Sequence, residues 1–106
     1  MRISMEHSRA RTSIPVEFEA SEMRGSGKIE NLSAQGLFVG TTDVPAEGDS
    51  VRLRFSAPGE PSVELTGLVW WTTLSAPDRA RRAPGFGLRL LDDSEAYDRI
   101  VSRLLP

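Results

Sequence analysis

The chain has 106 residues, of which 39% are hydrophobic and 26% charged, a composition typical of one soluble globular domain. It contains no cysteine, which excludes disulfides and thiolate metal sites. No stretch approaches the roughly 20 apolar residues of a membrane span, and the first 12 residues lack the apolar run of a signal peptide, so we expect a cytoplasmic protein. The net charge of −2 gives no general attraction to nucleic acid.

Alternation of hydrophobic and polar residues dominates the chain. Ile14, Val16 and Phe18 alternate with polar residues or proline and predict a first strand. Further strands are predicted at residues 23–30, 36–41, 51–55, 63–71 and 86–90. Gly25 and Gly27 interrupt the second of them, where we expect a bulge or a sharp bend. Six strands with little helix predict a mainly β fold, a small antiparallel β-barrel.

The last residues change to helical spacing. Their apolar positions recur three and four residues apart, at Tyr97, Ile100, Val101 and Leu104. Four residues suited to a helix start precede them: Asp92, Asp93, Ser94 and Glu95. We interpret these carboxylates as helix-starting groups rather than metal ligands or acid-base catalysts, because acids in a first turn complement the helix dipole. The C-terminal α-helix is expected to close one end of the barrel.

A polar turn separates two of the predicted strands. Residues 31–36 read Asn-Leu-Ser-Ala-Gln-Gly, an amide-x-Ser-x-x-Gly pattern. Asn31 and Ser33 have short side chains that hydrogen-bond a ligand or their own backbone, and Gly36 allows a backbone angle that other residues resist. Taken alone, the pattern is explained by a tight turn that binds nothing. Its position where a loop enters a strand is, however, common for binding residues.

Arginine is the main basic residue, since Lys28 is the only lysine. Its planar guanidinium group matches phosphates and guanine edges. Arg9 and Arg11 lie just before the first predicted strand. A second group occurs in the loop of residues 72–85, and we interpret it as solvated: Arg79, Arg81 and Arg82.

Two adjacent tryptophans occur in the fifth predicted strand. A regular strand directs Trp71 into the core with Val69 and leaves Trp70 on the opposite face with Leu68. That face packs under the terminal helix, or it forms part of a ligand platform or a protein interface.

Together these elements resemble the PilZ family of domains. The resemblance covers nearly the whole chain: the basic N-terminal segment, the first strand, the turn, the strand ending at residues 67–71, the Gly-x-Gly strand at residues 85–90 and the final helix. The sequence is especially similar to the PilZ-like domains of myxobacteria, whose turn is followed by Gly-Leu-Phe-Val, as at residues 36–39 here. The resemblance implies a split barrel over residues 13–106, preceded by a flexible basic arm over residues 1–12.

PilZ domains are receptors for the second messenger cyclic di-GMP, so the resemblance implies this ligand and no further cofactor or metal. One part of the family's site is the turn. The other is an Arg-x-x-x-Arg pair, for which this chain has Arg11 and, in the place of the first arginine, His7. Arg9 supplies a second guanidinium two residues out of register. The ligand-binding residues implied are Arg9, Arg11, Asn31, Ser33 and Gly36.

The family resemblance favours a receptor that transmits the messenger's level to an effector protein. The displaced arginine favours an alternative, a PilZ-like adaptor that binds proteins but not nucleotide. A nucleic-acid-binding barrel is less favoured, because the net charge is negative and no strand sets an exposed aromatic pair among basic residues. An enzyme is not expected, since the chain has no cysteine, a single histidine and no Gly-rich phosphate loop before a helix.

Overall fold

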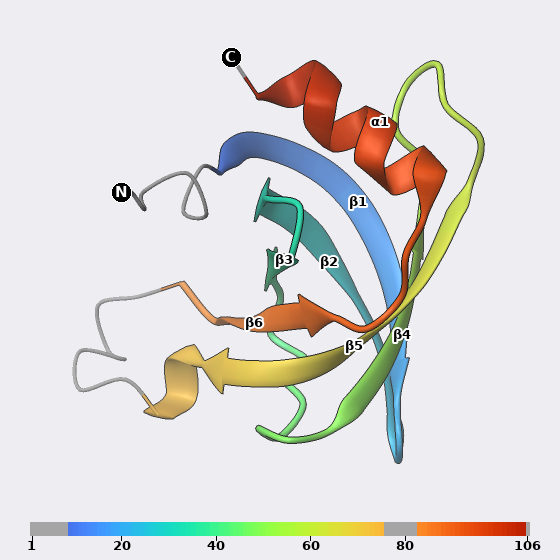
Figure 1. The fold of residues 1–106 in the computed structure, drawn as a ribbon. Helices are drawn as coiled ribbons and strands as arrows, with labels where there is room; N and C mark the ends of the chain where they lie inside the picture. The colour runs from blue at the N-terminus through green and yellow to red at the C-terminus, as the bar shows by residue number, and fades with distance from the viewer. Residues whose placement is uncertain (1–8, 76–82, 106) are drawn as a thin grey trace, which may run out of the picture.

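The computed structural model describes residues 9–75 and 83–105. In chain order its elements are β1 (Ala10–Ala20), β2 (Met23–Leu32), β3 (Gly36–Gly40), β4 (Ser50–Phe55), β5 (Val63–Thr72), the short 3-10 helix η2 (Thr73–Ser75), β6 (Gly85–Leu90) and α1 (Glu95–Leu104). The strands of the described residues pair antiparallel in the order β1-β2-β3-β6-β5-β4, and β4 pairs with β1 to close the barrel (Figure 1). The predicted six-stranded barrel with a C-terminal helix is confirmed.

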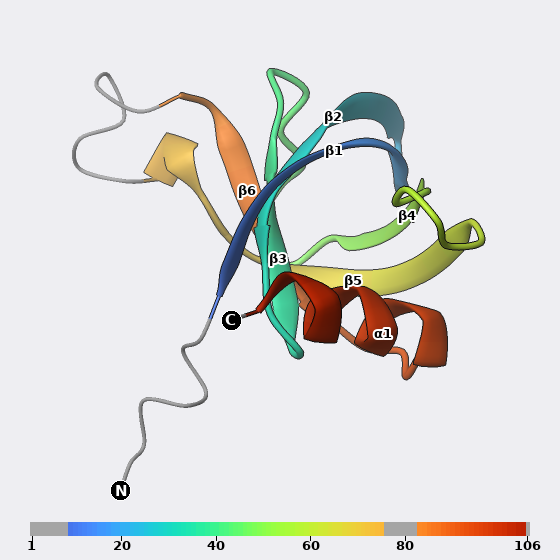
Figure 2. The ribbon, with the colours of Figure 1, turned by 90° about the horizontal axis from the view of Figure 1, so that it is seen from above.

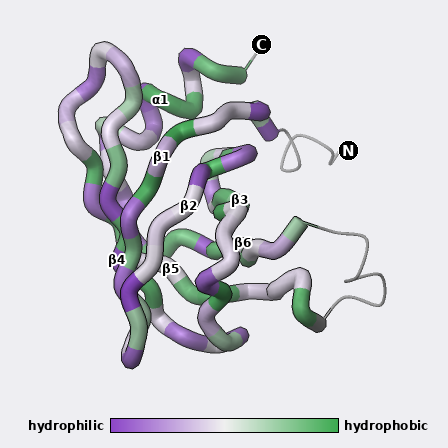
Figure 3. The backbone as a smooth tube through the Cα atoms, turned by 180° about the vertical axis from the view of Figure 1, so that it is seen from behind, coloured by the Kyte–Doolittle hydropathy of each residue, from purple (hydrophilic) through white to green (hydrophobic). Residues whose placement is uncertain are grey.

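Apolar side chains fill the barrel because each strand alternates between an inner and an outer face. In β4, for example, Val51, Leu53 and Phe55 are buried, whereas Arg52 and Arg54 are exposed. Hydrophobic and hydrophilic residues accordingly alternate along the strands in Figure 3. Burial of each large apolar side chain contributes about 1.5–3 kcal/mol relative to leaving it in water, so this core is the main source of stability.

The helix α1 lies across one end of the barrel, and its C-terminal end is near the start of β1 (Figures 1 and 2). Ser94 is its N-cap, and the Ser94 hydroxyl accepts a hydrogen bond of 3.1 Å from the backbone N–H of Tyr97. The helix buries Tyr97, Ile100 and Val101 against the barrel. Leu104, which was expected to share this face, is instead exposed.

Asp92 has a different task from the one predicted. Its Oδ2 atom accepts a hydrogen bond of 2.7 Å from the backbone N–H of Thr66 in β5. It therefore anchors the segment between β6 and α1 to the neighbouring strand, while Ser94 caps the helix.

Ion pairs join α1 to the connection between β4 and β5, which passes beside the helix in Figure 1. Glu60 accepts hydrogen bonds from Arg103 at 2.7 Å and from Arg99 at 3.4 Å. The hydrogen bond from Arg103 holds the pKa of Glu60 below its ordinary value. This hairpin and the helix are thus linked electrostatically as well as by packing.

Two details differ from the predicted strands. Of the two alternatives for Gly25 and Gly27, a bulge against β1 is not formed, because β2 pairs regularly with β1 there. A Cβ at Gly25 would lie 2.6 Å from the Phe18 ring, so this glycine makes room for a core aromatic. The predicted arm over residues 1–12 also ends too late. β1 begins at Ala10, which pairs with Leu32, so residues 10–12 are part of the barrel.

Candidate functional site

The turn between β2 and β3 is held in place by the helix. The backbone N–H of Ser33 donates to the Gly36 carbonyl at 2.8 Å, and the Ser33 hydroxyl donates to the same oxygen at 3.3 Å. The buried Tyr97 hydroxyl donates to the Ser33 carbonyl at 2.6 Å and approaches the Gly36 carbonyl at 3.3 Å. Burial raises the pKa of Tyr97, so this hydroxyl remains a donor at physiological pH. Because buried carbonyls need partners, Tyr97 fixes the shape of the turn.

Gly36 serves the turn by close approach rather than by an unusual backbone angle. Left-handed φ angles occur at Gly48, with 88°, and at Gly59, with 80°, but not at Gly36. A Cβ at Gly36 would lie 2.5 Å from the Leu88 carbonyl oxygen of β6. The predicted reason for this glycine was therefore wrong: a side chain would force β3 and β6 apart.

Arg9 and Arg11 lie beside the turn. Arg9 stands directly before β1 and Arg11 is its second residue. Both are exposed, and the buried Ala10 lies between them. The Arg9 Nε atom donates a hydrogen bond of 2.7 Å to Asn31 Oδ1, and Arg11 is the cross-strand partner of Asn31. The structure therefore brings both arginines to the turn.

Two β-bulges turn site residues outward. Glu30 is an extra residue of β2 relative to β3, because Ile29 pairs with Val39 and Asn31 with Phe38. With Ile29 and Leu32 both buried, this bulge places Asn31 on the outer face, where a regular strand would direct it inward. Bulges commonly re-aim side chains in this way.

The second bulge is at Trp70 in β5, where Val69 pairs with Leu88 and Trp71 with Gly87. The extra residue shifts Trp71 to the outer face, so both tryptophans are exposed, Trp70 by 59% and Trp71 by 38%. The expectation that Trp71 enters the core was wrong, because it assumed a regular strand.

Trp71 lies against its neighbours on the outer face. Its ring stacks on Phe38 of β3, with centroids 5.4 Å apart and planes inclined by 27°. Gly87 of β6 pairs with both residues, and a Cβ there would collide with the indole. The missing side chain lets the two rings meet across β6, which holds Trp71 in one orientation.

A cavity of about 330 Å³ links the turn, Arg9 and the tryptophans. Its wall includes Ser33, Gln35 and Gly36 from the turn, Trp70 and Trp71 from β5, and Leu88 and Arg89 from β6. Arg11 and Asn31 do not line it, although Asn31 contacts Arg9 at its edge. The site is therefore a polar turn facing two indoles, with arginine on both sides.

The charge of this site is not neutralised by carboxylates. We call Arg9, Arg11 and Arg89 the arginine rim; within residues 9–75 and 83–105, none of the three forms an ion pair with Asp or Glu. Arg89 instead places its guanidinium carbon 5.0 Å from the centre of the Trp70 ring, a cation–π geometry. An anion placed here would meet cations for which no carboxylate of the described residues competes.

The ligand-binding residues predicted from the sequence lie around one turn in the structure, and their binding role stays a prediction: Arg9, Arg11, Asn31, Ser33 and Gly36. Two further residues of the site were not predicted. The strand of Arg89 was predicted, but its position beside Gly36 and Trp70 was not. Tyr97 was predicted only as a core residue. His7 and the group Arg79, Arg81 and Arg82 lie outside the described residues.

The fold and this site define a known class of domain. The PilZ domain family model matches residues 4–105, and the chain therefore belongs to the PilZ family, whose members are known as cyclic di-GMP receptors. No curated protein sequence matches the chain.

The solved structures similar to this one include the following two. The first is the inhibitor of motility MotI/DgrA of Bacillus subtilis, with a TM-score of 0.68 and 20% identity over 92% of this chain. The present chain spans less than half of that protein, 46% of its length. The second is the PilZ domain of CeSA from a cellulose-synthesizing bacterium, with a TM-score of 0.61 and 19% identity, covering 91% of this chain and 93% of that one. At these identities, both show the fold alone.

Among the helices of the described residues, none has the length and apolar character needed to cross a membrane.

Proposed function

We propose that this protein is a cyclic di-GMP receptor whose ligand bridges the arginine rim and the turn of residues 31–36. The observation that supports the proposal most directly is the hydrogen bond from Arg9 to Asn31, beside cations that have no carboxylate partner among the described residues. This bond links the turn to an arginine two positions from the family's arginine pattern.

Cyclic di-GMP presents groups that suit this arrangement. It carries two phosphodiester anions and two guanines, each with O6 and N7 acceptors on the Hoogsteen edge. Arginine matches both kinds of group with pairs of parallel N–H donors. The Arg9 guanidinium uses Nε for Asn31 and keeps its terminal N–H groups for the ligand, while Asn31 keeps its amide N–H groups.

Ser33 has a supporting part in this proposal. Ser33 is buried, with 5% of the residue exposed, and its hydroxyl donates a hydrogen bond to the Gly36 carbonyl. Ser33 therefore shapes the backbone next to the ligand. Displacement of that weak bond of 3.3 Å frees the hydroxyl for a phosphate oxygen. The bound ligand then changes the surface that an effector protein binds.

Isothermal titration calorimetry of the whole chain with cyclic di-GMP, and with GTP as a control ligand, tests the proposal. We expect micromolar or tighter binding that weakens about ten- to a hundredfold in Arg9→Ala and in Arg11→Ala, because a charge-assisted hydrogen bond contributes about 1.5–3 kcal/mol. Arg24→Ala is the matched control, since Arg24 is exposed but paired with Glu19. If folded wild-type protein gives no heat of binding with cyclic di-GMP, the receptor proposal is rejected.

One observation favours a second function, a protein-binding adaptor that does not respond to nucleotide. Trp70, Trp71 and Leu74 are exposed on β5 and η2, and exposed aromatic side chains are typical of protein interfaces. An adaptor keeps its cellular effect when Arg9 and Arg11 are both replaced by alanine. A receptor loses the effect that depends on high cyclic di-GMP.

A further inference from the structure

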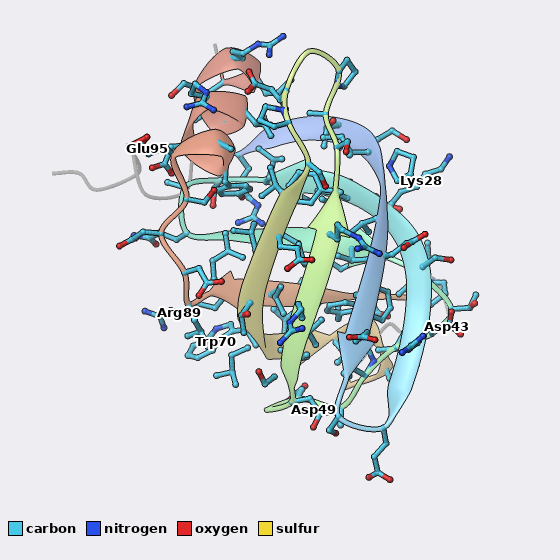
Figure 4. The ribbon with its side chains drawn as sticks, turned by 90° about the vertical axis from the view of Figure 1, so that its right-hand side faces the viewer. Lys28, Asp43, Asp49, Trp70, Arg89 and Glu95 are labelled. Atoms are coloured by element: carbon cyan, nitrogen blue, oxygen red, sulfur yellow. The ribbon has the colours of Figure 1, made fainter. Side chains whose placement is uncertain are left out.

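The most unusual surface feature of the described residues is a large aromatic ring left open beside the arginine rim. Trp70 is 59% exposed, although burying an indole is strongly favourable. Figure 4 shows Trp70 and Arg89 side by side at the edge of the barrel. The ring therefore needs an explanation other than core packing.

Alternation along β5 places this ring outside the barrel, since Trp70 follows the buried Val69. Trp70 is the extra residue of the β5 bulge, and the neighbouring Trp71 is fixed by its stack on Phe38 over Gly87. The Arg89 guanidinium lies at cation–π distance from the Trp70 ring and helps to hold it in one orientation. A planar group with two faces is thus covered by Arg89 on one side and open on the other.

The open ring and the turn belong to the same cavity. Trp70 and Arg89 line it together with Arg9, Gln35 and Gly36. Arg89 is the cross-strand partner of Gly36, so the cation that supports the indole also stands next to the turn. A ligand held by phosphate contacts to the rim has its base within reach of the ring.

We propose that Trp70 is a base-stacking residue of the nucleotide site, and that Arg89 is a positioning residue that holds the indole in place. This inference rests on the proposed cyclic di-GMP site and adds a specificity element to it. A purine stacks over a larger area than a pyrimidine, so Trp70 favours purine cyclic dinucleotides, while the rim and the turn select guanine by hydrogen bonds.

Calorimetry with cyclic di-GMP on Trp70 variants tests the stacking. Trp70→Ala is expected to weaken binding roughly 10- to 100-fold, the range of base–aromatic stacking, and Trp70→Phe by only a few-fold because a smaller ring remains. Leu91→Ala is the matched control, since Leu91 is equally exposed but does not line the cavity. Circular dichroism checks that each variant folds.

Fluorescence gives a readout that a purely structural residue would not move. In Trp71→Phe, Trp70 is the single tryptophan, and stacked guanine is expected to quench its emission as cyclic di-GMP is added. In Trp70→Phe, the remaining Trp71 should respond less, because it stacks on Phe38.

A double-mutant cycle tests the role of Arg89. If Arg89 acts through the indole, Trp70→Ala combined with Arg89→Ala weakens binding no further than Trp70→Ala alone. Additive losses overturn the positioning role and make Arg89 a separate ligand contact.

The outcomes separate this inference from the proposed function. Wild-type affinity in Trp70→Ala, together with weaker binding in Arg9→Ala, overturns the stacking and leaves the receptor intact; Trp70 then belongs to a protein interface. Absence of binding by the folded wild-type chain overturns both.

Discussion

The two faces of this barrel use arginine in opposite ways. On the face of β1, β2, β4 and β5, Arg54 contacts Glu17 at 3.3 Å and Glu64 at 3.9 Å, and Arg24 contacts Glu19 at 2.9 Å. These residues line the larger cavity, about 700 Å³, which we call the paired cleft. At the arginine rim, by contrast, the cations of the described residues have no carboxylate partner.

Neither cavity size nor arginine content distinguishes the proposed binding site from the paired cleft. In the paired cleft an anion at Arg24 or Arg54 would compete with a glutamate already in place, whereas Arg52, which also lines the cleft, forms no ion pair within the described residues. Exposed ion pairs of this kind add only about 0–1 kcal/mol to stability. At the rim the same side chains are available, and a rigid turn and an aromatic ring stand beside them. The pairing of Arg24 and Arg54 with glutamates therefore distinguishes the cleft from the rim, although both contain arginine.

The largest expected effect comes from removing charge on each face in turn. Replacing Arg9 and Arg11 together by alanine should weaken cyclic di-GMP binding more than a hundredfold and reduce its salt dependence, because two phosphate contacts are lost. Replacing Arg24 and Arg54 together should leave affinity unchanged. Calorimetry at two salt concentrations checks both, and equal losses from the two double variants would contradict the comparison.

The geometry of the turn can be broken without altering charge. Gly36→Ala brings a Cβ against the Leu88 carbonyl and should destabilise the protein by about 1–3 kcal/mol, the usual range for overpacking. Urea unfolding measures this loss. Gly59→Ala serves as a comparison for backbone strain, since Gly59 has a left-handed φ but is distant from backbone neighbours that would clash. A stable Gly36→Ala variant would show that β3 and β6 separate easily.

Tyr97→Phe tests how strongly the helix stabilises the turn of residues 31–36. Loss of the hydroxyl leaves the Ser33 carbonyl buried without its donor, which should cost about 1–2 kcal/mol, or roughly 4–16 °C in Tm for a domain of this size. We also expect a modest loss of ligand affinity, because the turn is less rigid. Thermal unfolding and calorimetry check the two effects; unchanged Tm would mean that water replaces the hydroxyl.

The smallest effect concerns the ion pairs of Glu60, which resemble those of the paired cleft. Its pKa is lowered in the folded protein, chiefly by the Arg103 hydrogen bond, so the pair stabilises the fold above the unfolded pKa of about 4.3. That contribution is lost as the pH falls through the folded pKa. In Glu60→Gln, Tm should therefore be slightly lower at neutral pH and depend less on acidification. Thermal unfolding between neutral and strongly acidic pH measures this, and parallel curves for both proteins would contradict it.

The fold was largely predictable because alternation and helical spacing are local properties of the chain. The alternation of Ile14, Val16 and Phe18 predicted β1. The helical spacing of Tyr97, Ile100 and Val101 predicted the buried face of α1. The cap was also local, since Ser94 stands directly before the helix. The acids were less predictable, because the partner of Asp92 is a backbone N–H 26 residues earlier in the chain.

The candidate site could be predicted only in part. Asn31, Ser33 and Gly36 are adjacent in sequence and form a recognisable pattern. Arg89 and Tyr97 contact the same turn but lie more than 50 residues after it in the chain. No short sequence pattern predicts contacts between residues so far apart. Trp71 was misplaced because a single extra residue in β5 inverts every later position of the strand, and a bulge depends on the partner strand.

By itself, the sequence determined that this is one small β-barrel with a terminal helix, and where its polar turn lies. The tertiary structure alone decided which arginines are paired, which ring stays exposed and which hydroxyl holds the turn. The physical reason is range: periodicity and capping act between neighbours along the chain, whereas ion pairs, bulges and buried hydrogen bonds depend on strands that meet only when the barrel closes.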